Sequence, residues 1–173
     1  RGFPAFLADS DLASLHPYLP DLARLELVCL DALHAADAQP IDSEVLACAL
    51  ARPETLPSLR LALHPSLTTL CSPYAVVSLW AAQQEDGRPP AVDPVAPESA
   101  WVLRRGRALR VLPMSAGDCR FVGALQAGAT LGEAAETAAA PGADGDLGFD
   151  LTRCLAVLLR EQVLTGITFA TPT

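Results

Sequence analysis

The sequence contains no lysine, no asparagine and a single methionine, and only 18% of its 173 residues are charged. An average soluble protein has about 25% charged residues, so this chain either exposes a small charged surface or covers part of its surface with a partner. All twelve basic residues are arginine, and the formal net charge is −8. Because clustered cations provide most of the affinity for duplex DNA, this charge makes nucleic acid an unfavourable ligand.

Long hydrophobic runs are also missing. No apolar stretch approaches the roughly 20 residues that span a bilayer, and no charged and then apolar leader opens the chain. We therefore expect a cytoplasmic protein that does not enter the membrane. Because the sequence begins at Arg1 without an initiator methionine, we expect a fragment or a processed chain.

The sequence also lacks the spacings of cysteine and histidine residues that are typical of metal sites. The sequence has no pair of cysteines two apart and no pair of histidines four apart, which are the usual signatures of a metal site. Its five cysteines lie 19 to 48 residues apart in apolar surroundings, a pattern typical of buried, reduced thiols. We expect no metal and no cofactor.

Apolar residues are abundant, at 51% of the chain, which is enough for a substantial core. In the first half, helical spacing, likely caps and period-2 alternation predict two helices, two strands and a further helix. These are helix 20–36, a helix from Asp42 to before Pro53, strands 59–63 and 67–71, and a helix from Pro73 to Gln84. The Pro-rich segment 85–98 is predicted to be a loop.

The second half predicts a hairpin followed by three helices. Residues 101–113 alternate around Arg105 and Gly106, with Trp101 and Leu103 on one face and Val111 across from them. Helix starts are predicted at three capping residues, two of them with an acidic residue three positions later. The three caps are Ser115, Thr130 and Asp150, and Gly166 is expected to end the last helix.

Together these elements predict an α+β fold. We expect a helical N-terminal segment, 1–54, and an α+β peptide-recognition domain, 55–173. The domain would contain a small mixed or antiparallel sheet built from 59–71 and 101–113. The order of a hairpin and then helices is that of a winged-helix-like peptide-recognition module.

His64 lies at the end of a predicted strand, two residues before Ser66. Such a pair could belong to a hydrolytic site, but residues two apart on a strand only share a face, and Pro65 breaks that register. No nucleophile elbow or glycine-rich phosphate loop is present. We expect no enzymatic activity, and we predict that the His64 ring caps backbone groups where one strand turns into the next.

The predicted hairpin is a basic region of an acidic chain, since residues 98–120 carry a local balance of +3. Arginines at a hairpin tip are ordinary on an exposed turn. Alternatively, the hairpin is an edge at which an acidic peptide pairs as a strand and guanidinium groups select it. Trp101 is either a core residue or an anchor for that peptide. The candidate peptide-binding residues are Trp101, Arg104, Arg105, Arg107 and Arg110.

Several segments resemble one known family, in the family's order and over nearly the whole chain. They are GFPAFL, YLPDLARLE leading into HAAD, RLALHPSLTTLCSPYAVVSLW, LQAGATLGEAAE and FDLTRCLAVLLREQVL. In these segments the chain resembles the HvfC/BufC family of peptide-modification chaperones, which is also described as a DNA-binding family. LHPSL, SPY and YLPDLARLE are the more specific blocks.

The resemblance implies a non-catalytic partner of a multinuclear iron-dependent oxidative enzyme. That enzyme modifies cysteines of a ribosomally made precursor peptide, as in the bufferins and, more distantly, methanobactin. The partner would hold the enzyme as a heterodimer and present the leader peptide. A helical N-terminal domain of roughly 90 residues usually precedes GFPAFL in the family, and this sequence departs from the family pattern in lacking it.

We place the enzyme on the acidic helix 20–36 and on the HPSL segment. The candidate interface residues are Arg24, Glu26, Asp31, His34, His64 and Ser66. The alternative function is a nucleic-acid-binding transcriptional regulator built on the winged-helix-like module. The acidic charge favours the peptide chaperone, because the last predicted helix carries only Arg153 and Arg160 beside Glu161.

Overall fold

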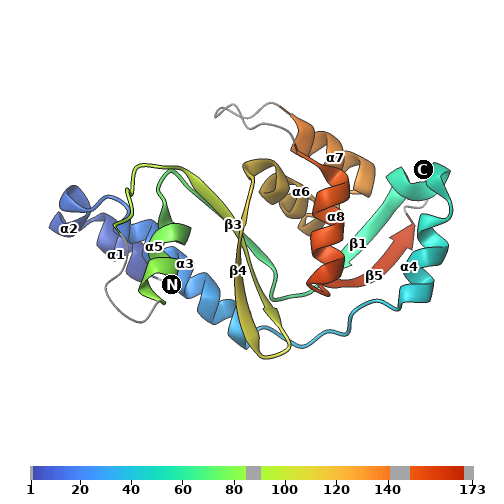
Figure 1. Cartoon of the computed structure of the whole chain (residues 1–173), viewed down its shortest axis with the longest axis horizontal. Helices are drawn as coiled ribbons and strands as arrows, with labels where there is room; N and C mark the ends of the chain where they lie inside the picture. Colours follow the sequence, from blue (N-terminus) through green and yellow to red (C-terminus); the bar gives the residue numbers. More distant parts are fainter. Residues whose placement is uncertain (1, 85–90, 141–148, 170–173) are drawn as a thin grey trace.

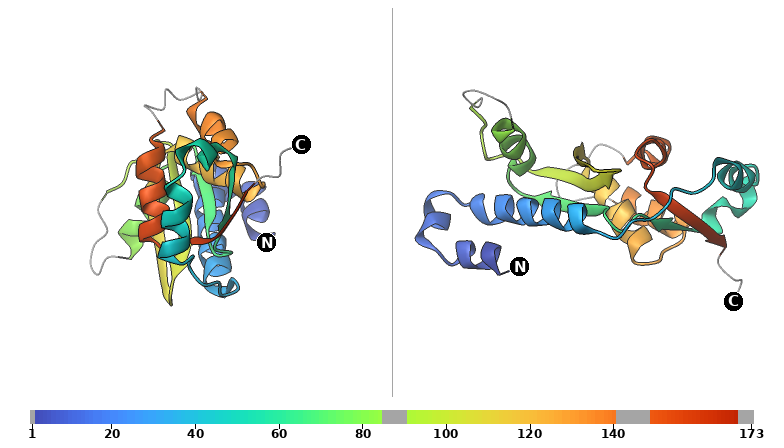
Figure 2. Two further views of the ribbon diagram at one scale, coloured as in Figure 1. Left: turned by 90° about the vertical axis from the view of Figure 1, so that its right-hand side faces the viewer. Right: turned by 90° about the horizontal axis from the view of Figure 1, so that it is seen from below.

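Helices fill the first third of the chain in the computed structural model, which describes residues 2–84, 91–140 and 149–169. Two short helices lead into a 16-residue helix, and another helix and a 3-10 turn follow. They are α1 (Phe3–Ala8), α2 (Asp11–Leu15), α3 (Leu19–His34), α4 (Ser43–Leu50) and η1 (Pro53–Ser58). The predicted helix 20–36 is confirmed as α3, which in Figure 2 runs along one side of an elongated molecule.

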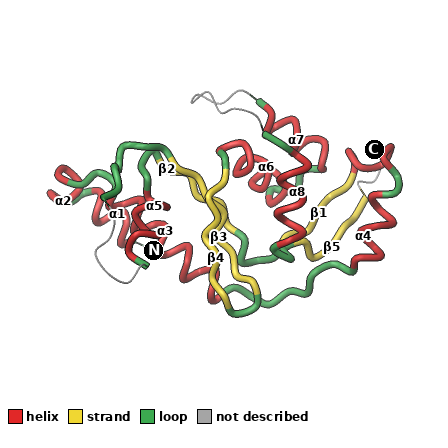
Figure 3. Tube along the Cα trace, in the orientation of Figure 1, coloured by secondary structure: helices red, strands yellow, loops and turns green. Residues whose placement is uncertain are grey.

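Among the described residues, five strands form two antiparallel sheets, not the single sheet that was predicted. They are β1 (Leu59–Leu63), β2 (Thr68–Ser72), β3 (Glu98–Arg105), β4 (Ala108–Met114) and β5 (Leu164–Phe169). One sheet has the order β2-β3-β4, and β1 pairs with β5 apart from it (Figure 3). The His64–Leu67 turn separates β1 from β2, because Leu67 N–H donates to His64 O and Pro65 has no N–H to offer a ladder.

The prediction that the last helix ends at Gly166 is wrong. Helix α8 (Leu151–Arg160) ends six residues earlier, where Gln162 takes a φ of 59°. The Val163 N–H then donates to Leu158 O at 3.1 Å, which closes the helix in the manner of a Schellman motif. The β-branched and aromatic residues that follow form β5, so Gly166 lies within a strand opposite Ala62.

Strand β3 is buried on both faces and separates two hydrophobic cores. Trp101 and Leu103 face one core, while Ala100 and Val102 face the other. The first core is covered by α8 together with α6 (Ala116–Gln126) and α7 (Leu131–Ala139). The second is covered by α3 and α5 (Val76–Gln83), so that in Figure 1 the β3–β4 hairpin stands between two groups of helices. The expectation for Val111 is wrong, because it lies opposite Val102 and packs on the second core.

The predicted helix caps are confirmed. Asp42 accepts from Glu44 N–H, Asp150 accepts from Arg153 N–H, and both capping boxes form, Ser115 with Asp118 and Thr130 with Glu133. Helix α5 starts at Val76, three residues later than predicted.

Helix α5 has no cap of its own. The Glu98 carboxylate of β3 instead accepts from the backbone N–H groups of Val77 and Ser78 and from the Ser78 hydroxyl. This long-range cap connects the start of β3 to the first turn of α5.

The two segments proposed from the sequence, 1–54 and 55–173, share both cores. Ala49 belongs to the first core and Leu25 to the second, and Ile41 N–H donates to Leu164 O at 2.8 Å. The boundary at residue 54 therefore does not separate independently packed units. Of the predicted loop 85–98, residues 85–90 lie outside the described residues, 91–97 are irregular, and Glu98 opens β3. In the described ranges, no helix is long and apolar enough to cross a membrane.

Candidate functional site

The tip of the β3–β4 hairpin is a two-residue turn made by Gly106 and Arg107. Arg105 pairs with Ala108 across it. Gly106 has a φ of 59°, whereas Arg107 is not among the residues of positive φ, which is the requirement of a type II′ turn. The turn follows the twist of the strands, so it projects Arg105 and Arg107 at the end of the sheet.

Arg104 is a structural residue, and its side chain is only 12% exposed. Its guanidinium donates to the carbonyls of Ala32 and Ala35 at the end of α3, to Gly106 O, and to the Asp37 carboxylate at 2.9 Å. A cation is favourable at a helix C-terminus, where the last carbonyls lack partners. Arg104 therefore holds α3 against the hairpin, and four of its five N–H donors are already used.

Trp101 is a core residue, since it is fully buried at 0% exposure. Its partner across the hairpin is Leu112, and its side chain packs in the first core. The indole Nε1–H has no hydrogen-bond partner among the described residues. Of the two roles left open by the sequence, burial supports the core role, and Trp101 cannot anchor a peptide at the surface.

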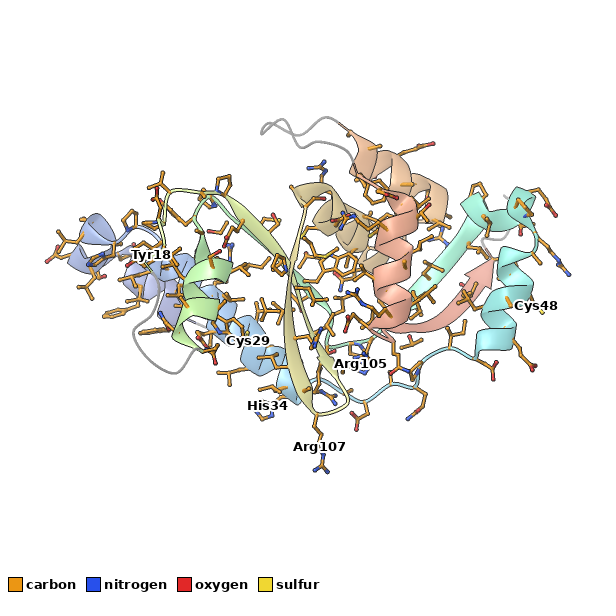
Figure 4. All side chains as sticks on the ribbon, viewed as in Figure 1. Tyr18, Cys29, His34, Cys48, Arg105 and Arg107 are labelled. Atoms are coloured by element: carbon orange, nitrogen blue, oxygen red, sulfur yellow. The ribbon has the colours of Figure 1, made fainter. Side chains whose placement is uncertain are left out.

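The basic surface of the hairpin is smaller than the sequence predicts. Arg110 lies 3.8 Å from the buried carboxylate of Glu161, through its Nε atom. Arg105 and Arg107 are exposed, and in the described part of the chain neither side chain has an ion-pair or hydrogen-bond partner. Figure 4 shows Arg107 extending away from the hairpin tip. These two arginines are the available cations of the candidate site.

His64 and Ser66 are buried and lie in hydrogen-bond contact. The Ser66 N–H donates to His64 Nδ1 at 3.1 Å, which confirms that the ring caps a backbone group at the turn after β1. The Ser66 Oγ also lies 2.8 Å from Nδ1 and accepts from Arg104 N–H at 3.0 Å. The expectation that Pro65 keeps the pair apart is wrong, but Ser66 is only 1% exposed and its oxygen is engaged by the fold.

Burial lowers the pKa of His64, and the nearby Arg104 cation lowers it further, while Asp37 acts in the opposite sense. The unfolded chain therefore binds a proton more readily than the folded one near pH 6. We expect the free energy of unfolding to decrease as pH falls below about 6.5, by at most about 1.4 kcal/mol per pH unit from this group. His64→Asn keeps an acceptor near the Nδ1 position but does not titrate, so urea unfolding at pH 7.5 and 5.5 should show a smaller loss in the variant.

The matched control for this experiment is His34→Asn, on the exposed end of α3. It should lose as much stability between the two pH values as the unmodified protein does. A His64→Asn protein that loses as much as the His34→Asn protein would contradict the assignment.

A polar cavity of about 290 Å³ brings several of these residues together. Its walls include Asp37, His64, Arg104, Arg105 and Glu161. The two surfaces that the sequence assigned to different partners, the hairpin and the HPSL segment, thus meet in one place. The structure places them at the junction of α3, the hairpin tip and the end of α8.

Glu161 was not identified from the sequence as a site residue. It is 2% exposed, its Oε1 accepts from Arg160 Nε at 3.0 Å, and its Oε2 has no hydrogen-bond partner among the described residues. A glutamate after a helix normally faces solvent. Here the turn at Gln162 folds the chain back and buries the carboxylate, an effect of tertiary structure with no local signal.

The candidates on α3 lie apart from the cavity. Glu26, Asp31 and His34 are exposed, and Arg24 is bound to Asp21 at 3.4 Å and to the Cys71 carbonyl. They form an exposed, mainly acidic surface. His64 and Ser66 do not join it, because both are buried.

All five cysteines are free thiols, as predicted, but the prediction that all are buried is wrong for Cys48 and Cys71, which are exposed. Within the described ranges, no group of three histidine, cysteine or acidic side chains is placed to hold a metal ion. Comparison with known protein families, curated proteins and solved structures finds no match to this chain.

Proposed function

We propose that this protein binds an extended acidic peptide along β4. In this proposal it does so as the non-catalytic partner of a multinuclear iron-dependent oxidative enzyme that modifies cysteines of a ribosomally made precursor. The observation that carries the peptide-binding part is that β4 is an open edge strand that begins beside two exposed arginines, Arg105 and Arg107, which have no side-chain partner among the described residues. The choice of enzyme and precursor rests on the sequence resemblance.

Strand β4 is the more open edge of the three-stranded sheet. It pairs with β3 and with no other described strand, and none of its seven residues is buried. The opposite edge, β2, has Leu70 and Ser72 buried. An added strand would use the outward N–H and C=O groups of β4, which bind any peptide sequence of suitable shape. Pro113 removes one donor near the far end of the strand.

Selectivity for acidic peptides would come from Arg105 and Arg107. They lie where β4 begins, so an acidic side chain at one end of the peptide would set its direction and register. The rest of the chain is acidic, so its negative charge disfavours the binding of anions at surfaces away from the hairpin tip. The hairpin followed by α6, α7 and α8 has the element order of a winged-helix-like module, to which β5 adds a strand paired with β1. We assign enzyme binding to the exposed face of α3 that carries Glu26, Asp31 and His34.

The double variant Arg105→Glu and Arg107→Glu is expected to bind the peptide about tenfold more weakly at roughly 0.05 M salt and less than threefold more weakly at 0.5 M, because salt screens exposed charges. The measurement is fluorescence anisotropy of a fluorescein-labelled, extended acidic peptide. A labelled DNA duplex in parallel tests the regulator alternative, and tight duplex binding near physiological salt would favour it.

The matched control is Arg52→Glu, an exposed arginine at the start of η1, away from the hairpin. It changes the charge in the same sense as each hairpin substitution and should leave affinity nearly unchanged. Equal weakening by Arg52→Glu and Arg107→Glu would mean that only net charge matters, and unchanged affinity in the double variant would remove the hairpin from the binding site.

A further inference from the structure

Cys71 is an exposed thiol at the opposite end of the same sheet from the arginines. It is the fourth of five residues of β2 and lies opposite Ser99 of β3. The hairpin tip begins six residues beyond Ser99, so the two places are roughly 20 Å apart along β3. Nothing in the proposed peptide-binding site uses this thiol.

The Cys71 thiol opens into a cavity of about 570 Å³. Ser72, Pro73 and Pro97 form one part of its wall, and Met114 and Ser115 form another. Ser115 is the N-cap of α6, so the positive end of that helix faces the same space. The cavity therefore offers apolar walls on two sides of a sulfur atom, together with an electropositive end.

A second thiol lies against the same face of the sheet. Cys119, in the first turns of α6, is 4% exposed, and its Sγ lies 3.6 Å from Ala100 O and 3.9 Å from Leu70 O. Leu70 precedes Cys71 in β2 and pairs with Ala100, which follows Ser99. The buried thiol is therefore next to the exposed one, and the two side chains interact.

The environment separates the two thiols chemically. The interaction with the Cys119 thiol lowers the pKa of Cys71 to about 6 despite partial burial, with help from the Ser99 hydroxyl and from Arg24 and Arg120. The same interaction and burial raise the pKa of Cys119. The other charged groups around this end of the sheet are Asp21 on α3, bound to Ser72, Glu98 at the start of β3, and Asp118 on α6, which is paired with Arg153.

We propose that Cys71 and Cys119 form a dithiol that reduces disulfides, with Cys71 as the attacking thiolate and Cys119 as the resolving thiol. An exposed, ionised thiol beside a buried, protonated one is the arrangement that thiol–disulfide exchange requires.

The exchange balances within the protein and its substrate. Cys71 Sγ attacks one sulfur of the substrate disulfide, so that an S–S bond forms to the protein and the other substrate sulfur leaves as a thiolate. Cys119 loses its proton to that thiolate or to water and attacks Cys71 Sγ, which releases the second substrate thiol. The substrate disulfide gains two electrons, and the protein is left with a Cys71–Cys119 disulfide.

The substrate class is a disulfide at a surface, carried either by a small thiol compound or by a peptide. The apolar walls made by Pro73, Pro97 and Met114 fit the carbon chain beside a disulfide. An extended peptide and a dimeric small thiol share this chemistry, and the experiment separates them.

The test uses the full chain in a Cys48→Ser background, which removes the other exposed thiol. Dithiobis(nitrobenzoate), a chromogenic disulfide, should release two equivalents of thionitrobenzoate per folded protein and leave no adduct, and peptide mapping should find Cys71 joined to Cys119. With Cys119→Ala added, one equivalent should be released and the adduct should remain on Cys71. With Cys71→Ser added, release should nearly stop. A lasting adduct on Cys71 in the Cys48→Ser protein would overturn the proposal, and this readout needs no substitution at Cys119.

The rate at which Cys71 reacts with dithiobis(nitrobenzoate) in the Cys48→Ser protein is compared with the rate at which Cys48 reacts in a Cys71→Ser protein. At pH 7 the greater thiolate fraction of Cys71 is largely offset by the weaker nucleophilicity of an acidic thiolate, so we expect only about a two- to threefold advantage over an ordinary thiol. At pH 5.5 the advantage should grow to about twentyfold. Equal rates at pH 5.5 would contradict the proposal. Faster reduction of a disulfide-linked peptide than of oxidised glutathione would identify the peptide as the substrate class, and the reverse order would identify the small thiol.

Discussion

Replacing Trp101 by alanine is expected to lower the free energy of unfolding by about 3 to 5 kcal/mol, the range for removal of a large buried aromatic side chain. Trp101 is the largest of the fully buried side chains and packs between β3 and the helices of the first core. Because β3 also carries Val102 on its other face, a cavity on one side should loosen the support of both cores. Urea unfolding followed by circular dichroism measures the loss.

Trp101→Phe is the matched control for this substitution. It keeps an aromatic ring in the core and removes an indole N–H that has no partner among the described residues. The smaller ring leaves a small void, but the unpaired donor no longer has to be buried, so we expect a change within about 1.5 kcal/mol. A loss for Trp101→Phe as large as that for Trp101→Ala would show that the indole N–H is bonded in solution.

Arg104→Met is expected to cost about 2 to 4 kcal/mol, although it removes an arginine from a basic surface. The substitution keeps much of the aliphatic stem but leaves the carbonyls of Ala32 and Ala35 without their donor, and hydrogen bonds from a charged group typically contribute about 1.5 to 3 kcal/mol. The contact with Asp37 adds little, because that carboxylate is 87% exposed.

Arg107→Met provides the comparison, because the two arginines lie on the same hairpin and receive the same substitution. Arg107 is exposed at the tip, so its loss should change the free energy of unfolding by less than about 0.5 kcal/mol. Equal effects of the two substitutions in urea unfolding would mean that Arg104 does not hold α3 to the sheet.

Local signals in the sequence predicted most of the helices. Asp42, Ser115, Thr130 and Asp150 each mark a helix start by a hydrogen bond within the same few residues, and such bonds depend little on the rest of the fold. Strand pairing is different, because the partner of β1 lies about a hundred residues later in the chain. Alternation in Leu59–Leu63 predicts a strand but carries no information about β5.

The candidate site shows the same division. The sequence identifies arginines but does not distinguish Arg104, which binds the end of α3, from Arg107, which faces solvent. The burial of Glu161 and the contact between Cys71 and Cys119 arise from elements that meet only in the folded chain. The sequence therefore shows which chemical groups are present at these positions. It does not predict which groups each side chain contacts or whether the side chain is exposed.

The position of β3 between two cores has a consequence for cooperativity. Two cores in one chain often allow one part to melt before the other. Here the two cores use alternate side chains of β3. Opening either core would expose one face of β3 and weaken the packing of this strand against the other core. Helix α3 packs on the second core and the C-terminal helices pack on the first, but they depend on each other through β3 and should unfold together.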